Sequence, residues 1–351
     1  MTVVEVFLFG TLRHPPLARA VFGRTVEVRP AVLAGWSVRR AAEGDWPVLV
    51  AGGAAEGGVA RLDGGALERA DWYEALFGYR RSRCVLADGT VAEVYRPEGD
   101  PAAAEGWSLS DWATSHGRTA TLAARAAMQR LGEDPARVAK RITAIRRRAE
   151  ARARAGDGPA GDVALLSSKR VHDAFYELLN QRWSVPLLDG SARHELDRTT
   201  LAGFDAAIVL PWDRVRDRVM LIRQFRAALA VRGERDPFST EPVAGLIDPG
   251  ETPEEAAHRE AEEEGGLRIH ALHSVGEGYP TPGGTTEYHF LFIGECDLPD
   301  GAGGIGGLDA EGEDIEATLV PAGRLVADAV AGRVRNAPLH LLALALDRMR
   351  R

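Results

Sequence analysis

A loop, a short helix and a glycine stop over Gly245–Leu267 constrain this chain more than any other stretch. Thr252 can cap a helix whose first residue is Pro253, and Glu255, three residues after the cap, completes a capping box. Two consecutive glycines follow and can supply the left-handed turn that ends the helix. The sequence therefore predicts a helix over roughly residues 253–264.

Three carboxylates lie on one face of this predicted helix. Glu260, Glu263 and Glu264 are spaced i, i+3 and i+4, which places them within a single turn. Each like pair would destabilise the helix by about a few tenths of a kcal/mol unless a positive charge opposes it. Hard divalent cations bind clustered carboxylate oxygens, so Mg²⁺ or Mn²⁺ is the expected cofactor. The alternative is a solvated acidic face in which Arg259 pairs with Glu263.

Length and composition predict a two-domain protein and exclude several classes. The chain has 351 residues, of which 45% are hydrophobic, enough for two cores. A net charge of −8 argues against a general nucleic-acid binder. Cys84 and Cys296 lie far apart without metal-ligand spacing, which fits a reducing cytoplasm. No run approaches the ~18 apolar residues of a membrane span, so no membrane association is expected.

The longer pattern around the acidic helix is that of a known family. Gly245, Glu251 six residues later, and Arg259-Glu260-Ala-x-Glu-Glu-x-Gly-Leu267 reproduce the signature of the Nudix hydrolases at every fixed position. The segments Arg-Gln-Phe-Arg before it, Pro-Gly-Gly-Thr-x-Glu after it and Gly-Ile-x-Gly-Leu-x-x-Glu-x-Glu-Asp-Ile further on resemble the ADP-ribose pyrophosphatases. The resemblance runs through residues 163–350. It implies an α/β/α sandwich that hydrolyses ADP-ribose to AMP and ribose 5-phosphate with a divalent metal.

The resemblance also implies roles for individual residues. Glu311, on a glycine-rich acidic loop, would be the general base on the attacking water, and Arg259 would orient a glutamate. The loop acid could enter the site only when substrate and metal are bound. The implied metal ligands are Glu260, Glu264, Glu263, the carbonyl of Ala244 and, near the metals, Glu313.

The substrate and partner contacts implied by the resemblance involve a second set of residues. Arg226 and Glu287 would contact ADP-ribose. In this family the domain is a dimer that exchanges its N-terminal strands, so Arg198 and the pair Phe175-Tyr176 would reach the nucleotide of the partner subunit. A homodimer is therefore expected.

Two other functions remain open from the sequence. The Pro-Gly-Gly and Glu-Asp-Ile segments are shared with pyrophosphatases of other nucleoside diphosphate sugars, such as GDP-mannose. A ligand-sensing Nudix module that binds without cutting is the second alternative, although an intact set of acids around Arg259 argues against it.

The first hundred residues resemble a different family. The opening Phe-Leu-Phe-Gly-Thr-Leu-Arg and the stretch Ala70-Asp-Trp-Tyr-Glu74 are similar to segments of the γ-glutamylcyclotransferase-like (AIG2-like) proteins, which implies a mixed β-barrel. In that family Glu74 would be the acid/base catalyst, and Gly10, Thr11 and Leu12 would hold the glutamyl group. A vestigial or docking domain is equally open. The fusion of the two domains resembles proteins named for tellurite resistance.

Composition breaks divide the chain into three expected parts of an α+β protein. Residues 1–103 carry short strand patterns separated by Gly, Pro and Asp, and residues 104–160 read as helical. A basic helix between residues 135 and 154 could touch RNA, but a solvated linker helix is preferred because it lacks aromatic residues. Residues 161–351 contain apolar strands and a C-terminal helix over about residues 338–350.

Overall fold

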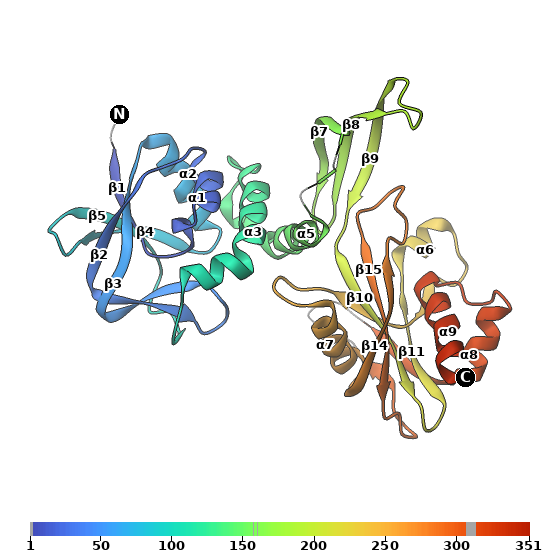
Figure 1. The fold of residues 1–351 in the computed structure, drawn as a ribbon. Coiled ribbons are helices and arrows are strands. Elements are labelled where there is room, and N and C mark those ends of the chain that lie inside the picture. The colour runs from blue at the N-terminus through green and yellow to red at the C-terminus, as the bar shows by residue number, and fades with distance from the viewer. Residues whose placement is uncertain (1–2, 157, 160, 307–313) are drawn as a thin grey trace. The chain divides into compact units, whose positions relative to one another are not determined.

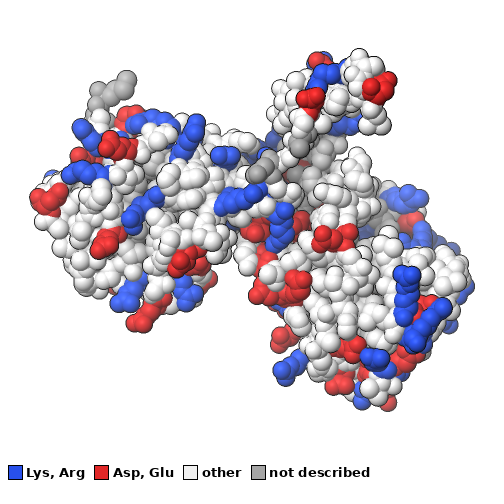
Figure 2. All heavy atoms as spheres, in the orientation of Figure 1, with Lys and Arg blue, Asp and Glu red and all other residues white. Residues whose placement is uncertain are grey.

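The structure is a computed structural model that describes residues 3–156, 158–159, 161–306 and 314–351. The chain divides into two compact units, Met1–Ala160 and Gly161–Arg351 (Figure 1). Figure 2 shows positive and negative side chains interspersed over the visible face of each unit. Within the described ranges, no helix combines the length and apolar character that crossing a bilayer requires.

The first unit is built on an open, curved sheet in the order β4-β5-β1-β3-β2-β6. Side chains of the first strand and of Phe9, which follows it, alternate between two cores. Val6 and Leu8 face the helices, whereas Phe7 and Phe9 belong to the core on the other side of the sheet. The expected α+β fold is thus confirmed, and the sheet is a half-barrel where a mixed β-barrel was expected. The strands are β1 Val4–Leu8, β2 Val28–Ala41, β3 Pro47–Leu62, β4 Tyr79–Val85, β5 Val91–Pro97 and β6 Ala103–Ala104.

Helices cover one face of this sheet. They are the 3₁₀ turn Thr11–Arg13, α1 Pro15–Phe22, α2 Gly64–Ala75, α3 Leu109–Met128, α4 Pro135–Ala139 and α5 Ile142–Ala155. Glu74 therefore lies on a helix, in a part of the chain for which the sequence analysis gave only strand patterns. That analysis missed α2 although Asp63 caps it, accepting a hydrogen bond from the Ala66 amide at 2.9 Å.

The structure also corrects the reading of residues 104–160 as a linker. Trp112 and Ala127 on α3 and Ile145 on α5 are buried in the same core as the helices of the first domain. The arginine-rich composition of α5 hid an apolar stripe at Ile142, Ile145 and Ala149, spaced to face one side. Burial of that stripe makes the segment part of the first unit.

The second unit contains an eight-stranded mixed sheet between two helical layers. Along β10, Ala207 and Val209 face the core that α7 closes, whereas Ile208 and Leu210 face the core of α8 and α9 (Figure 1). The predicted α/β/α sandwich is confirmed. Its elements are β10 Asp205–Asp213, β11 Arg218–Phe225, α6 Ala227–Arg232, β12 Phe238–Glu241, β13 Val243–Leu246, α7 Pro253–Gly265, β14 Ile269–Gly278, β15 Tyr288–Cys296, β16 Gly304–Gly306, β17 Ile315–Pro321, α8 Ala322–Val330 and α9 Ala337–Arg350.

A separate three-stranded antiparallel sheet precedes the sandwich in the second unit. It consists of β7 Ala164–Asp173, β8 Glu177–Pro186 and β9 Arg193–Ala202. The last strand was not predicted, because its sequence is mostly polar and lacks an apolar alternation. Pairing with β8 from Glu177 to Pro186 holds it in an extended conformation. Much of this sheet is exposed, including Leu165, Leu166 and Val171.

Candidate functional site

Helix α7 begins and ends as the sequence predicts. The Glu255 amide donates to Thr252 Oγ1 at 3.2 Å, and the Thr252 amide donates to Glu255 Oε2 at 2.8 Å, so the capping box is complete. Gly266 ends the helix with φ 61°, in the left-handed region. Three alanines, Ala256, Ala257 and Ala261, are fully buried against the sheet. Their small side chains let α7 lie close to β13 and β10.

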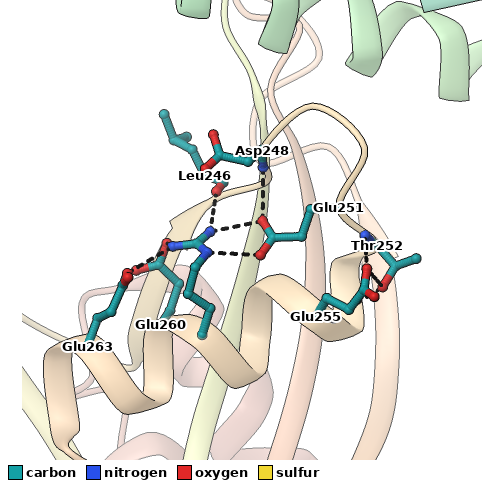
Figure 3. A network of polar contacts seen from close by, with 8 residues as sticks. Leu246, Asp248, Glu251, Thr252, Glu255, Glu260 and Glu263 are labelled. Atoms are coloured by element: carbon teal, nitrogen blue, oxygen red, sulfur yellow. Dashed lines mark hydrogen bonds and ion pairs between the residues drawn. The ribbon is translucent and has the colours of Figure 1, made fainter. Parts of the chain in front are cut away.

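Arg259 is the centre of the polar network on this helix. Figure 3 labels its partners Leu246, Glu251, Glu260 and Glu263. Its Nε and Nη2 donate to Glu251 Oε1 and Oε2 at 2.8 and 2.9 Å, and Nη2 also donates to the Leu246 carbonyl at 3.0 Å. Its Nη1 donates to Glu260 Oε1 at 2.5 Å and to Glu263 Oε2 at 3.0 Å. Hydrogen bonding to Glu251, followed by the charges of Glu260 and Glu251, holds the guanidinium pKa above its ordinary value. The arginine therefore ties the loop acid to two helix acids.

A glycine makes room for the Glu260 carboxylate. A Cβ added to Gly245 would lie 1.8 Å from Glu260 Oε1 and 1.9 Å from its Cδ. Gly245 lies on β13 and pairs with Ala207 of β10, so the strand backbone forms one wall of the acidic site. Only a residue without a side chain permits this close approach.

Glu264 is the most buried of the helix acids. Only 8% of its surface is exposed, and its Oε2 accepts a hydrogen bond from the Ala244 amide at 3.2 Å. The structure thus brings Ala244, the residue expected to ligate metal through its carbonyl, next to Glu264. Among the residues in described ranges, however, no group of three or more His, Cys, Asp or Glu side chains converges as a metal site. Arg259 binds two of the predicted ligands, Glu260 and Glu263, and a cation would compete with it for their oxygens.

The donor set nevertheless fits a hard divalent cation. The donors are carboxylates, and Gly245 leaves room for one of them, Glu260, against the strand backbone. Glu264 is buried, and a buried carboxylate needs a positively charged or hydrogen-bonding partner. Glu311 and Glu313 lie outside the described residues. Their predicted roles as general base and metal neighbour are therefore neither placed nor excluded.

A second polar group includes three of the predicted substrate contacts. Arg226, at the end of β11, binds the buried Glu241 through Nη2 at 2.6 Å and Nε at 3.1 Å. Burial raises the pKa of the Tyr176 hydroxyl, the Glu287 charge raises it further and the Arg226 charge opposes them. Arg226, Glu287 and Tyr176 thus lie close enough to interact. The sequence analysis missed Glu241. Its position as a polar residue at the end of a short strand, where it is buried, could have indicated a role.

The aromatic pair just before β8 packs within its own chain. The rings of Phe175 and Tyr176 lie 4.8 and 5.5 Å from the ring of Phe204. Arg198, on exposed β9, donates to the Asp197 carbonyl at 2.8 Å. Its predicted contact with a nucleotide in the partner subunit stays a prediction.

In the first unit, the predicted catalyst Glu74 is half-buried. Burial raises the pKa of its carboxyl to about 8. A cleft of about 580 Å³ beside the end of its helix is lined by Asp71, Ala75, Gly78, Tyr79, Arg80, Arg81, Tyr95 and Glu98. Two of these residues hold Asp71: the Tyr95 hydroxyl donates to Oδ1 at 2.8 Å and Arg81 Nη2 to Oδ2 at 3.0 Å. Sequence reasoning missed this network because its members lie on α2, β4 and β5.

The predicted glutamyl-binding loop lies elsewhere in the same unit. Gly10 packs so closely on Pro47 that an added Cβ would lie 2.5 Å from the proline Cγ, and Leu12 is buried in the helical core. Neither Gly10, Thr11 and Leu12 nor Glu74 itself is among the residues that line the cleft at the end of α2. The joint role of the three loop residues in binding a glutamyl group stays a prediction.

Comparisons with known proteins place this geometry in a family. Residues 204–339 match the model of the NUDIX domain, and residues 6–114 match the model described as Gamma-glutamyl cyclotransferase, AIG2-like. The ADP-ribose pyrophosphatase of Escherichia coli (strain K12) is 36% identical over 176 residues, which cover 50% of this chain and 83% of that protein. The chain belongs to the Nudix family.

Other relatives are also similar over about half of the chain. The GDP-mannose pyrophosphatase of Cronobacter sakazakii is 36% identical over 182 residues, covering 52% of this chain and 93% of that protein. The ADP-ribose pyrophosphatase of Haemophilus influenzae is 34% identical over 161 residues, covering 45% and 74%. A solved structure described as an ADP compounds hydrolase covers 55% of this chain and 96% of its own, with 20% identity and a TM-score of 0.42. The predicted fusion of a Nudix domain to an AIG2-like domain is confirmed.

Proposed function

We propose that the Nudix domain hydrolyses the pyrophosphate bond of ADP-ribose to AMP and ribose 5-phosphate. The observation that carries this proposal is the 36% identity to an ADP-ribose pyrophosphatase of which 83% is covered. The acidic site supports it, because Arg259 binds both Glu260 and Glu263, and the buried Glu264 accepts a hydrogen bond from the Ala244 amide beside them.

The chemistry requires positive charge beside the diphosphate. The pyrophosphate carries two negative charges that repel the electron pair of an attacking nucleophile. Divalent cations, when bound, would neutralise these charges and lower the pKa of a bound water. Glu260, Glu263, Glu264, the Ala244 carbonyl and Glu313 are the residues proposed to hold Mg²⁺ or Mn²⁺. Glu311 is proposed to accept the proton of the attacking water.

The surrounding residues hold these acids in place. Arg259 restrains Glu260 and Glu263, and its bidentate contact with Glu251 fixes its own plane. Gly245 leaves the strand backbone open to Glu260. Arg226, oriented by buried Glu241, is proposed to bind the substrate together with Glu287 and Tyr176.

The proposal is tested by separating the products of ADP-ribose incubated with the purified full-length chain and Mg²⁺. AMP and ribose 5-phosphate are expected in equal amounts, and EDTA should stop their release. Absence of AMP across a titration of Mg²⁺ and Mn²⁺ would refute the proposal.

A second substrate class is favoured by one specific observation. The GDP-mannose pyrophosphatase of C. sakazakii is also 36% identical and is covered over 93% of its length. A panel of nucleoside diphosphate sugars ranked by kcat/KM distinguishes the two, with ADP-ribose expected first. A catalytically silent sensing module would bind members of this panel and release no product from any of them.

We infer that the protein forms a homodimer through the second unit. The exposed β7-β8-β9 sheet supports this, since Leu165 and Leu166 are about half exposed on it (48% and 49%). Arg198 and the pair Phe175-Tyr176 were predicted to reach the nucleotide site of the partner. In the proposed dimer Arg198 and Phe175 keep that role, and Tyr176 is proposed to act beside Arg226 and Glu287 of its own chain. Light scattering of the full-length chain should give twice the monomer mass, and Leu165→Glu with Leu166→Glu should reduce it to the monomer mass.

For the first unit, we propose a γ-glutamyl cyclotransferase in which Glu74 transfers the proton. Its carboxyl, with a pKa of about 8, is suited to accept and return a proton near neutral pH. Release of 5-oxoproline from γ-glutamyl amines and dipeptides, lost in Glu74→Gln, is the expected result. Absence of release across that panel would leave the docking role.

The remaining predictions concern the setting of the protein. The two cysteines carry free thiols, which supports the proposed cytoplasmic location. The net charge of −8 supports the expectation that the chain does not bind nucleic acid generally. A role in tellurite resistance stays a prediction from the resemblance of the domain fusion.

A further inference from the structure

The loop that leads to Glu287 is attached to the end of strand β9. The Leu201 amide donates to the Gly284 carbonyl at 2.9 Å, and the Thr286 amide donates to the Leu201 carbonyl at 3.0 Å. These two bonds form a parallel bridge between Leu201 and Thr285, outside the regular strands. The loop therefore has a defined register against β9.

Two threonine side chains complete this attachment. The Gly203 amide donates to Thr286 Oγ1 at 3.0 Å, and the Glu287 amide donates to Thr285 Oγ1 at 3.2 Å. Thr285 is 8% exposed. A buried hydroxyl that accepts a backbone hydrogen bond restrains that backbone, because leaving the amide without a partner would be costly. The position of Glu287 along the chain is thereby set.

Gly203 determines where the Glu287 side chain can lie. A Cβ added to this buried glycine would lie 2.6 Å from Glu287 Cγ, 3.5 Å from its Cδ and 3.2 Å from Thr285 Oγ1. The Glu287 side chain thus lies against the Gly203 α-carbon. The backbone of Gly203 is outside the left-handed region, so a larger residue meets this side chain rather than backbone strain.

The same segment carries the aromatic residues beside the proposed substrate contacts. Phe204 follows Gly203 directly and packs against Phe175 and Tyr176. The Tyr288 amide, next to Glu287, donates to the Phe204 carbonyl at 3.4 Å. Two of the residues proposed to bind substrate are therefore contacted by this segment: Gly203 lies against the Glu287 side chain, and Phe204 packs against the Tyr176 ring.

We propose that Leu201, Gly203, Thr285 and Thr286, which we call the β9 clamp, position Glu287 for binding of the nucleotide sugar. The clamp residues do not act on the substrate themselves. They fix the Glu287 carboxylate at a set distance from Tyr176 and Arg226, and so determine substrate affinity rather than the chemical step. This proposal rests on the proposed function, in which Glu287 contacts the substrate.

The first test adds one methyl group. Gly203→Ala forces Glu287 Cγ to move by at least 0.8 Å, from 2.6 Å to an ordinary contact of 3.4 Å. A displacement of this size should raise the KM for ADP-ribose about tenfold and leave kcat within about twofold. Gly278→Ala is the matched control, because its added Cβ meets nothing within 4 Å and its backbone is equally outside the left-handed region. The control should leave both constants unchanged.

A double-mutant cycle tests whether the rise in KM caused by Gly203→Ala depends on the Glu287 side chain. Glu287→Ala removes the Cγ that the new methyl group would meet, so Gly203→Ala should cause no further rise in KM in that background. A pair of single variants tests the hydrogen bond that the Gly203 amide donates to Thr286 Oγ1. Thr286→Val should raise KM severalfold, whereas Thr286→Ser keeps the hydroxyl and should restore the wild-type value.

The clamp would be overturned by an unchanged KM in Gly203→Ala, by KM effects that add in the double variant, or by Thr286→Ser behaving as Thr286→Val. Thermal unfolding without substrate separates this proposal from the proposed function. Gly203→Ala should lower Tm in the wild type and not in Glu287→Ala, whichever nucleotide sugar is cleaved. If no AMP is released but the Tm effect of Gly203→Ala still depends on Glu287, ADP-ribose is refuted as the substrate and the clamp proposal stands. If the Tm effect no longer depends on Glu287, the clamp proposal is overturned.

Discussion

Gly245→Ala should inactivate the Nudix site through a single methyl group. The added Cβ would lie 1.8 Å from Glu260 Oε1, so reaching an ordinary contact of 3.4 Å requires a displacement of at least 1.6 Å. The strand is held by pairing between Gly245 and Ala207, so the carboxylate has to move rather than the backbone. A displacement of about 1 Å in a catalytic group can cost about 100-fold in rate. We expect kcat to fall at least about 100-fold, equivalent to about 2.7 kcal/mol in the barrier.

The assay is steady-state hydrolysis of ADP-ribose over a titration of Mg²⁺, with Tm measured in parallel. Because Glu260 is a proposed metal ligand, the Mg²⁺ concentration for half-maximal activity should rise as kcat falls. Gly278→Ala, whose Cβ enters open space, is the matched control and should retain wild-type kcat and Mg²⁺ dependence. The variant should remain folded, since Gly245 is not in the left-handed region.

A Gly245→Ala variant that keeps kcat within about threefold of the wild type at saturating Mg²⁺ would contradict this expectation. In that case Glu260 either does not need its observed position or does not take part in the reaction. A lower Tm with unchanged kcat would likewise show that the close approach serves packing and not catalysis.

Three other variants test separate parts of the structure. Glu264→Gln can still accept the hydrogen bond from the Ala244 amide, so Tm should change little while kcat falls more than about 100-fold; normal turnover would exclude Glu264 as a metal ligand. Glu241→Gln weakens the contact that orients Arg226, so the KM for ADP-ribose should rise about tenfold with a smaller change in kcat. An unchanged KM would contradict this role of Glu241. In the first unit, the folded Glu74 carboxyl keeps its proton between its ordinary pKa of 4.5 and about 8, so wild-type stability should fall as pH rises through that window. Glu74→Gln lacks this dependence, and its Tm advantage over the wild type should grow from pH 5 to 8.5; parallel Tm profiles would refute the raised pKa.

Local sequence signals predicted the elements whose ends depend on nearby residues. Thr252 and Glu255 cap α7 through bonds that span three residues, and Gly266 ends it by its own conformation. The apolar runs of β10 and β11 are buried on both faces and lie between helical layers, which their composition indicated. These signals are short-range, so they can be read without a fold.

Other elements depend on partners that are distant in the chain. Polar β9 is a strand because β8 pairs with it, and glycine-rich β3 is one continuous strand because β2 pairs with nearly its whole length. The helix α5 belongs to the first core because Ile145 is buried there, although arginines dominate its sequence. Composition predicts a solvated linker in that case, and tertiary burial overrides it.

The sequence by itself determined the family, the α7 acids and the separation into a Nudix part and an AIG2-like part, because these depend on residue types at fixed local spacing. Tertiary structure alone decided that Gly245 faces Glu260, that Glu241 holds Arg226 and that Gly203 lies against Glu287. Each of these pairs is separated by 15 or more positions in the sequence. Their contact follows from strand register and helix packing, and neither is encoded in a local pattern.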